Sequence, residues 1–295
     1  MKKLSGEKVF DYAVNISLVL IAIIVLYPIW YVLIASISSP QAIANGEVLL
    51  FPKGINFAAY RKLLDNKMIW IGYKNSILYT AAATVLHLVV VIPCAYALSV
   101  KRLPGRSFFM TLFVITMYFS GGMIPTYLLI NSLGMINTPW AMIVPGCVSA
   151  YNMIVARSFF ESNIPDSLLD AARIDGCGYT RFFLNIVIPL SPAVIAIIAL
   201  FVIQANWNGY LSAQMYLYDS DLFTLQQVIK GITAKIDQSL AADSGMTMEQ
   251  MLRIIQERQL LKYAVVIVSS IPLVILYPFI QKFFVKGIMV GAVKE

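Results

Sequence analysis

Long apolar runs separated by short polar segments dominate the pattern of this chain. The first run, from about Tyr12 to Ser36, holds no charged residue, and its roughly 25 residues are enough to cross a hydrocarbon core about 30 Å thick. Five further runs are similarly apolar: Asn75 to Val100, Ser107 to Ile130, Pro139 to Phe160, Phe182 to Gln204 and Leu260 to Phe284. Backbone groups in lipid must be satisfied within each segment, so the runs predict helices. The sequence therefore predicts an all-α polytopic membrane protein with six transmembrane helices.

The composition agrees with a membrane location. Of the 295 residues, 59% are hydrophobic and 13% are charged, which is far more apolar than a soluble domain. The net charge of +7 arises from Lys and Arg residues placed between apolar segments rather than on one basic face. We therefore expect contact with membrane lipid and no binding of nucleic acid.

The distribution of basic residues predicts the orientation. With the N-terminus inside, about twelve Lys and Arg residues fall in or beside cytoplasmic segments, including Lys101, Arg102 and Arg106. About ten others fall outside, mostly in two long loops where the rule is weaker. We expect both termini to be cytoplasmic.

The two outer loops carry helical patterns of their own. In the first, Phe57, Tyr60, Leu63 and Leu64 share one predicted helical face after an Asn56 cap. The second, residues 207–259, is long enough to expect a function, and it has helical patches around Leu225 to Ile232 and Met248 to Gln256.

A cytoplasmic stretch from Leu168 to Pro192 predicts a helix, a turn and a second helix. Leu168, Leu169 and Ala172 share one face of the first helix, and Gly176 permits the positive φ of a tight turn. We expect Pro165 in the first turn of the first helix and Thr180 as the N-cap of the second. The small side chains of Ala171 and Ala172, beside the charge of Asp170, suit docking in the groove of another protein.

The same residues resemble the EAA loop of importer-type ABC permeases, whose pattern is E-A-A, three residues, G, nine residues, I, one residue, L-P. The spacing agrees at every position, with Asp for Glu and Ile for Leu, and the matching residues are Asp170, Ala171, Ala172, Gly176, Ile186, Ile188 and Pro189. The resemblance implies that this loop contacts an ATPase, with Asp170 facing an Arg of that partner.

The resemblance extends over most of the chain. Three further segments are similar to carbohydrate-uptake permeases of the maltose-permease type, and most of all to their LplC/YtcP subgroup: SGGMIPTYLLINSLGMINTPWAMIVPG, WNGY and FFVKGIMVGAVKE. This implies the type I ABC importer permease fold, in the cytoplasmic membrane of a bacterium. It also implies a heterodimer with a second permease, two cytoplasmic ATPases that carry ATP and Mg, and an extracellular sugar-binding lipoprotein. The substrates of the subgroup are complex oligosaccharides, including pectin-derived galacturonides.

The resemblance also implies further candidate sites. Gly287, Gly291, Val293 and Lys294 are expected to form a thin, strand-like tail between the ATPases. Sugar-binding residues in this family tend to lie on the partner permease, so this chain is expected to supply one wall of the substrate path. The candidates for that wall are Tyr118, Tyr151, Asn152, Asn206 and Trp207.

The chain lacks the motifs of catalytic and ion-driven proteins. It has no phosphate-binding loop, no Ser/His/Asp set and no ligand partner for the single His87, so we expect no catalytic residue, metal or cofactor on this chain. The spans also lack charged residues near their centres, which argues against a proton-driven or voltage-driven protein. A secondary carrier, an ABC permease for a solute other than sugar and a polytopic membrane enzyme remain as alternatives.

These patterns predict three parts. Residues 1–72 hold the first span and the amphipathic outer helix. Residues 73–285 form the permease core, with the cytoplasmic coupling loop at 161–181 and the outer loop at 207–259. Residues 286–295 form the cytoplasmic tail.

Overall fold

The computed structural model of the chain describes residues 6–238 and 247–292. Every regular element in these residues is a helix, which confirms the all-α prediction. The chain divides into two compact units, one formed by Met1–Lys67 with Ile229–Ile271 and the other by Met68–Val228 with Pro272–Glu295. The predicted boundary between residues 72 and 73 lies near the first division. The sequence did not indicate that residues 229–271 join the N-terminal segment.

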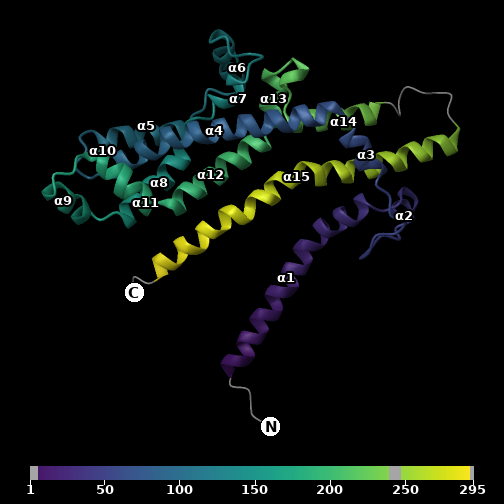
Figure 1. Ribbon diagram of the computed structural model, residues 1–295, viewed down its shortest axis with the longest axis horizontal. Coiled ribbons are helices and arrows are strands. Elements are labelled where there is room, and N and C mark those ends of the chain that lie inside the picture. Colours follow the sequence, from purple (N-terminus) through teal and green to yellow (C-terminus); the bar gives the residue numbers. More distant parts are fainter. Residues whose placement is uncertain (1–5, 239–246, 293–295) are drawn as a thin grey trace. The chain divides into compact units, whose positions relative to one another are not determined.

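Figure 1 labels most of the helices along the chain. In chain order they are α1 Gly6–Ser36, α2 Pro40–Ala44, α3 Ala58–Leu64, α4 Lys67–Ser99, α5 Arg106–Tyr118, α6 Met123–Ser132, α7 Trp140–Ile143, α8 Ala150–Asn163, α9 Asp166–Ile174, α10 Tyr179–Phe182, the π-helix η1 Phe183–Val187, α11 Ile188–Leu190, α12 Pro192–Trp207, α13 Tyr210–Tyr216, the 3-10 turn η2 Ser220–Leu222, α14 Leu225–Gln238 and α15 Met248–Ala292. Both helical patches predicted for the second outer loop are confirmed by α14 and the start of α15.

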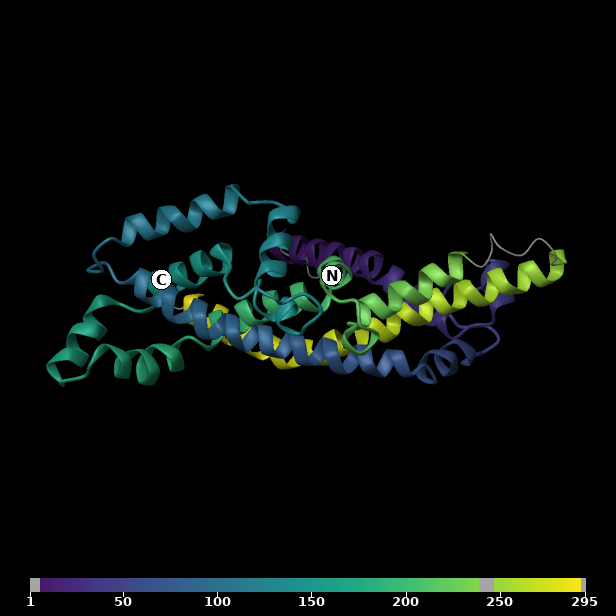
Figure 2. The same cartoon turned by 90° about the horizontal axis from the view of Figure 1, so that it is seen from above.

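Three described helices are long and apolar enough to cross a membrane, in the segments Phe10–Ser36, Lys67–Ser99 and Ile254–Phe283. Two bent pairs raise the number to as many as five, with an angle of 113° between α5 and α6 and of 80° between Tyr179–Leu190 and α12. Figure 2 shows the sharp turn that separates α5 from α6. Gly122, at the start of α6, has a φ of +85°, which a residue with a side chain rarely adopts.

The predicted span from Pro139 to Phe160 is not one helix. The structure divides it into α7 and α8, because Pro145 and Gly146 fall between them and α8 begins afresh with Ser149 as its N-cap. The Ser149 side chain accepts a hydrogen bond from the Asn152 amide at 3.3 Å. Length and composition in the described residues thus support up to five of the six predicted spans.

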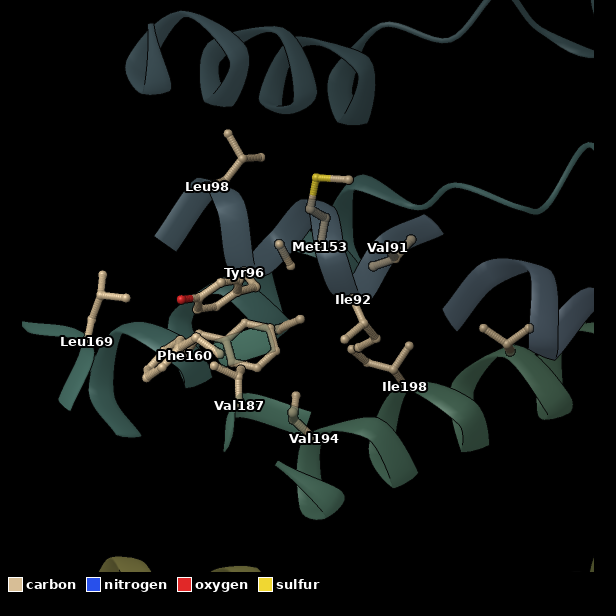
Figure 3. Close-up of a cluster of buried hydrophobic side chains, with 14 of the residues drawn as sticks. Val91, Ile92, Tyr96, Leu98, Met153, Phe160, Leu169, Val187, Val194 and Ile198 are labelled. Carbon is tan, nitrogen blue, oxygen red and sulfur yellow. The ribbon is translucent and has the colours of Figure 1, made fainter. Parts of the chain in front are cut away.

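In the second unit, α4, α8 and α12 lie side by side and enclose a buried apolar cluster (Figures 1 and 3). Its members include Val91, Ile92 and Tyr96 from α4, Met153 and Phe160 from α8, and Val194 and Ile198 from α12. Helix α9 places Leu169 and Ala172 in the same cluster, and α10 places Phe182 there, so both helices are packed against the spans.

The beginning of α4 holds the segment that leads into α14. The Asn75 side-chain amide donates hydrogen bonds to the carbonyls of Asp221 at 2.8 Å and Phe223 at 3.0 Å. At Gly72, an added Cβ would lie 2.9 Å from the Cα of Leu225, so glycine is required for this close approach. This part of the second outer loop is therefore fixed to the second unit.

The amphipathic helix of the first outer loop is present as α3. The predicted cap is wrong by one residue, because Phe57 is the N-cap of α3. Asn56 lies just before it, and its side chain accepts a hydrogen bond from the Ala58 amide at 2.8 Å. Only part of the predicted apolar face is buried, because Leu63 is enclosed whereas Phe57 and Leu64 are exposed.

Candidate coupling site

The stretch predicted as a helical hairpin is formed by α9 and α10, which we call the α9–α10 hairpin. Gly176 has a φ of +73°, and the Cys177 amide donates to the Ala172 carbonyl at 2.9 Å, which closes the end of α9. The predicted turn is confirmed. Pro165 lies just before α9 rather than in its first turn, and Thr180 is not the N-cap, because α10 already starts at Tyr179 after Gly178.

The two faces of α9 have opposite surroundings. Leu169 and Ala172 are each 7% exposed and belong to the buried cluster of the second unit. On the other side, Ser167 and Ala171 are exposed and Ile174 is 88% exposed. These three residues form what we call the outer face of α9. The burial of Leu169 and Ala172 side by side confirms the shared face predicted for them. Of the two alanines expected to suit docking, only Ala171 lies on the outer face, and the large exposed apolar residue there is Ile174.

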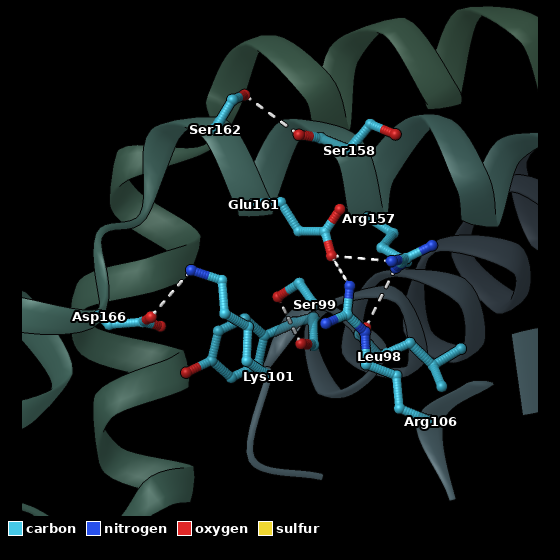
Figure 4. A network of polar contacts seen from close by, with 10 residues as sticks. Leu98, Ser99, Lys101, Arg106, Arg157, Ser158, Glu161, Ser162 and Asp166 are labelled. Carbon is cyan, nitrogen blue, oxygen red and sulfur yellow. Dashed lines mark hydrogen bonds and ion pairs between the residues drawn. The ribbon is translucent and has the colours of Figure 1, made fainter.

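Asp170 forms an ion pair within the chain. Its two carboxylate oxygens accept hydrogen bonds from the Arg102 guanidinium at 3.1 and 3.4 Å. One turn earlier, Asp166 accepts from Lys101 at 3.2 Å, a contact visible in Figure 4. These pairs are at least 47% exposed on every side chain, so each stabilises the docked arrangement by only about 0 to 1 kcal/mol.

The sequence did contain a signal for these two pairs. Asp166 and Asp170 are four residues apart, which places them on one helical face, and Lys101 and Arg102 are adjacent in a short loop. By themselves, these basic residues predict only the orientation of the chain. The structure shows that they also hold α9 in place.

The second half of the EAA-like motif, which ends at Pro189, lies in an irregular helix. Ile186 lies in the π-helix η1 and packs against the buried cluster, while Pro189 is exposed in α11. Ser191 then ends α11 and donates its hydroxyl to the Val187 carbonyl at 2.7 Å. Pro189 and Pro192 cannot donate backbone hydrogen bonds, which favours the 80° bend at this point.

Tyr96 connects the α9–α10 hairpin to the spans. Its ring stacks on Phe183 with centroids 5.2 Å apart and meets the edge of Phe160 at 5.8 Å. Phe182, the last residue of α10, is fully buried beside it. Close-packed aromatic contacts of this kind resist independent movement of the parts, so the hairpin is joined firmly to α4 and α8.

The candidate path residues have different surroundings. Tyr118 and Tyr151 are 79% and 55% exposed. Asn206 donates its amide to the Val202 carbonyl of its own helix at 3.0 Å, and Trp207 is buried, 6.4 Å from the ring of Tyr73. Of these four, the exposed tyrosines present the largest surface, and a substrate role for each of them stays a prediction.

The fifth candidate, Asn152, is buried and bonded to His87. The His87 Nδ1 lies 3.0 Å from the Gly146 carbonyl, which can only accept, so Nδ1 carries the proton. The other ring nitrogen, Nε2, then accepts from the Asn152 amide at 3.0 Å. This arrangement holds the break between α7 and α8 in place.

The predicted tail differs from its expected form. Helix α15 continues to Ala292, so Gly287 and Gly291 lie in a helix and not in a strand-like segment. Val293 and Lys294 lie outside the described residues. Entry of this end of the chain into an ATPase interface stays a prediction.

Comparison with known proteins gives consistent results. Residues 68–290 match the family described as binding-protein-dependent transport system inner membrane component. The polygalacturonan/rhamnogalacturonan transport system permease protein YtcP of Bacillus subtilis strain 168 is 37% identical over 98% of this chain and 99% of that protein. Protein LplC of the same organism is 34% identical over 100% of this chain and 98% of that protein.

A chain in a solved structure is also similar to this protein over almost its whole length. The crystal structure of a bacterial ABC transporter involved in the import of the acidic polysaccharide alginate contains a chain with a TM-score of 0.79 and 32% identity, covering 96% of this chain and 99% of that one. These similarities confirm the resemblance to sugar ABC permeases and the fold that it implied.

Proposed function

Because the chain belongs to the family of binding-protein-dependent transport system inner membrane components, we propose that it is a permease subunit of an ATP-driven oligosaccharide importer. The observation that carries the proposal is the α9–α10 hairpin, which has the spacing of a coupling loop, an exposed outer face and a buried inner face. ATP and Mg bind to two separate ATPase subunits in this account, and this chain catalyses no reaction.

The hairpin acts as a rigid connection between an ATPase and the spans. Moving an inward-open to outward-open equilibrium from 1:99 to 99:1 requires roughly 5.5 kcal/mol of differential binding. The exposed Asp170 pair contributes at most about 1 kcal/mol, so it cannot supply this difference. The buried side chains of Leu169, Ala172 and Phe182 transmit the force instead, because they are packed in the same cluster as α4, α8 and α12.

The substrate class is proposed from the relatives. YtcP is named for polygalacturonan and rhamnogalacturonan transport, and the solved structure is described as an importer of the acidic polysaccharide alginate. We infer that this chain transports oligosaccharides, with acidic ones as the first to test. Its partners are a second permease in a heterodimer, the two ATPases and an extracellular sugar-binding lipoprotein.

The proposed topology places both termini and the α9–α10 hairpin on the cytoplasmic side of the cell membrane. The basic residues of the α4–α5 and α8–α10 segments support this orientation. The second outer loop then faces the sugar-binding protein.

The proposal is tested by co-purification and transport. The tagged chain is expected to retain a second permease and two ATPases, and proteoliposomes of that complex should accumulate oligosaccharide only with ATP and loaded binding protein. Uptake that collapses with an ionophore and ignores ATP indicates a secondary carrier. Turnover of a substrate by the purified chain alone indicates an enzyme, and ATP-dependent uptake of another solute indicates a different ABC permease.

A further inference from the structure

A basic hollow lies at the start of α5, separate from the outer face of α9. Its volume is about 680 Å³, and it is open to the surroundings. Cationic, hydroxyl and aromatic side chains line it, and the residues that matter here are Lys101, Arg106, Ser107, Phe108, Thr111 and Arg157. The hollow has the size of a site for a small ligand group.

Two half-buried arginines at this hollow share one carboxylate. Arg106 and Arg157 both contact the same Oε1 atom of Glu161, with Arg157 at 2.8 Å (Figure 4). Their side chains are only 22% and 21% exposed. Two cations on one anion leave an excess positive charge, and a partly buried charge is costly unless it is paired. The arrangement therefore favours an added anion.

The arginines are also held in position. The Arg157 Nε donates to the Leu98 carbonyl at 3.1 Å, which fixes the side chain against the end of α4. Lys101 adds a third cation at the rim, where it is paired with Asp166. A group that enters this hollow therefore meets two arginines held in place by other contacts, with the exposed Lys101 beside them.

An exposed apolar strip continues from the hollow along α5. Phe108, Leu112 and Ile115 follow one another at helical spacing and are 64%, 44% and 45% exposed. Helix α5 has no buried residue, although it belongs to a bent pair that is apolar enough to cross a membrane. A cationic hollow at one end of such a strip matches a molecule with an anionic head and hydrocarbon chains.

We propose that the hollow binds the phosphate of an anionic phospholipid, with acyl chains along the strip formed by Phe108, Leu112 and Ile115. Basic pockets at the ends of transmembrane helices bind anionic headgroups through the same charge-assisted hydrogen bonds. The carboxylate of an acidic sugar is also an anion, but a sugar gains little from the apolar strip. The proposal does not depend on the transported solute or on the ATPases.

The test uses the full chain in detergent, with native mass spectrometry to count retained lipid. Phosphatidylglycerol should be retained in preference to phosphatidylcholine. Arg106→Gln should reduce retained phosphatidylglycerol about tenfold or more, since it removes a charge-assisted contact, while phosphatidylcholine is unchanged. The matched control is Lys53→Gln, which removes an exposed cation paired with Glu47 at 3.6 Å in the other unit and should change neither lipid.

A second variant and two competing anions distinguish a lipid site from a site for free phosphate or an acidic sugar. Lys101→Gln is the second variant, for use if Arg106→Gln does not fold. It should reduce retained phosphatidylglycerol by a smaller factor, because Lys101 is largely exposed. Inorganic phosphate and trigalacturonate at millimolar concentration should leave phosphatidylglycerol bound. Displacement by phosphate identifies a free-anion site, and displacement by trigalacturonate identifies a sugar site. Either displacement, or unchanged lipid selectivity in Arg106→Gln and Lys101→Gln, overturns the proposal.

Discussion

Ile174 provides the clearest test of the outer face of α9. This side chain is 88% exposed, so its surroundings contribute little to the fold of the chain itself. If docking on an ATPase covers it, Ile174→Ala removes three carbon atoms from the interface. At about 0.8 kcal/mol for each buried methylene, the loss is about 2 kcal/mol, or roughly 30-fold in affinity. Asp170→Ala removes an exposed pair worth at most about 1 kcal/mol, so its effect should be smaller.

The assay measures the affinity of the purified ATPase for the permease complex, together with the thermal midpoint of the complex without ATPase. Ile174→Ala should weaken ATPase binding and leave the midpoint unchanged. Ile55→Ala is the matched control, because Ile55 is 66% exposed in the first outer loop. Binding within twofold of the unmodified protein, or an equal loss in the control, would refute the assignment of this face.

Three more predictions follow from the geometry. Gly176→Ala should reduce ATP-dependent transport in the uptake assay while the protein still inserts in the membrane, because a φ of +73° costs a residue with a Cβ about 1 to 2 kcal/mol. The control is Gly178→Ala, which should have little effect on uptake, since Gly178 has an ordinary φ and equal space for a Cβ. A double-mutant cycle of Arg102→Ala and Asp170→Ala, measured as ATPase affinity, should give a coupling energy below about 1 kcal/mol, because the ion pair is largely exposed. A larger coupling energy would contradict the small contribution assigned to this pair. Gly72→Ala should destabilise the protein by about 1 to 3 kcal/mol in thermal unfolding, since its Cβ would meet backbone atoms, and an unchanged midpoint contradicts the close approach.

The turn of the α9–α10 hairpin could be predicted because it depends on local chemistry. Gly176 follows the last turn of a helical pattern, and glycine at that position readily adopts the positive φ that ends a helix. The long runs of α1, α4 and α15 were also visible, since uninterrupted apolar sequence of this length predicts a membrane span.

The orientation of α9 could be predicted only in part. Helical spacing placed Ala172 on one face with Leu168 and Leu169, but only the structure shows that this face packs against the cluster of the second unit, which leaves Ala171 outside. The partner of Asp170 depends on the return of the chain after α4, which brings Arg102 beside it across many intervening residues. Such long-range contacts are set by tertiary packing and leave only weak patterns in one sequence.

The breaks in the spans show a similar limit. Pro145 with Gly146 stops helix α7 and separates it from α8, but Pro93 lies inside α4 without ending it. Proline removes the same backbone donor in both places, and the outcome depends on what else satisfies the local backbone. The bond from His87 to the Gly146 carbonyl provides one such partner at the break.

The central claim is that ATP hydrolysis on partner subunits drives transport through this chain by way of α9. The most direct measurement is oligosaccharide uptake into proteoliposomes that contain the complete complex, with either the unmodified chain or Ile174→Asp, which places a charge on the outer face of α9. The account predicts ATP-dependent uptake by the unmodified complex and its loss in the variant, with both permeases still assembled. Equal uptake by the two complexes, or uptake driven by an ion gradient without ATP, would contradict it.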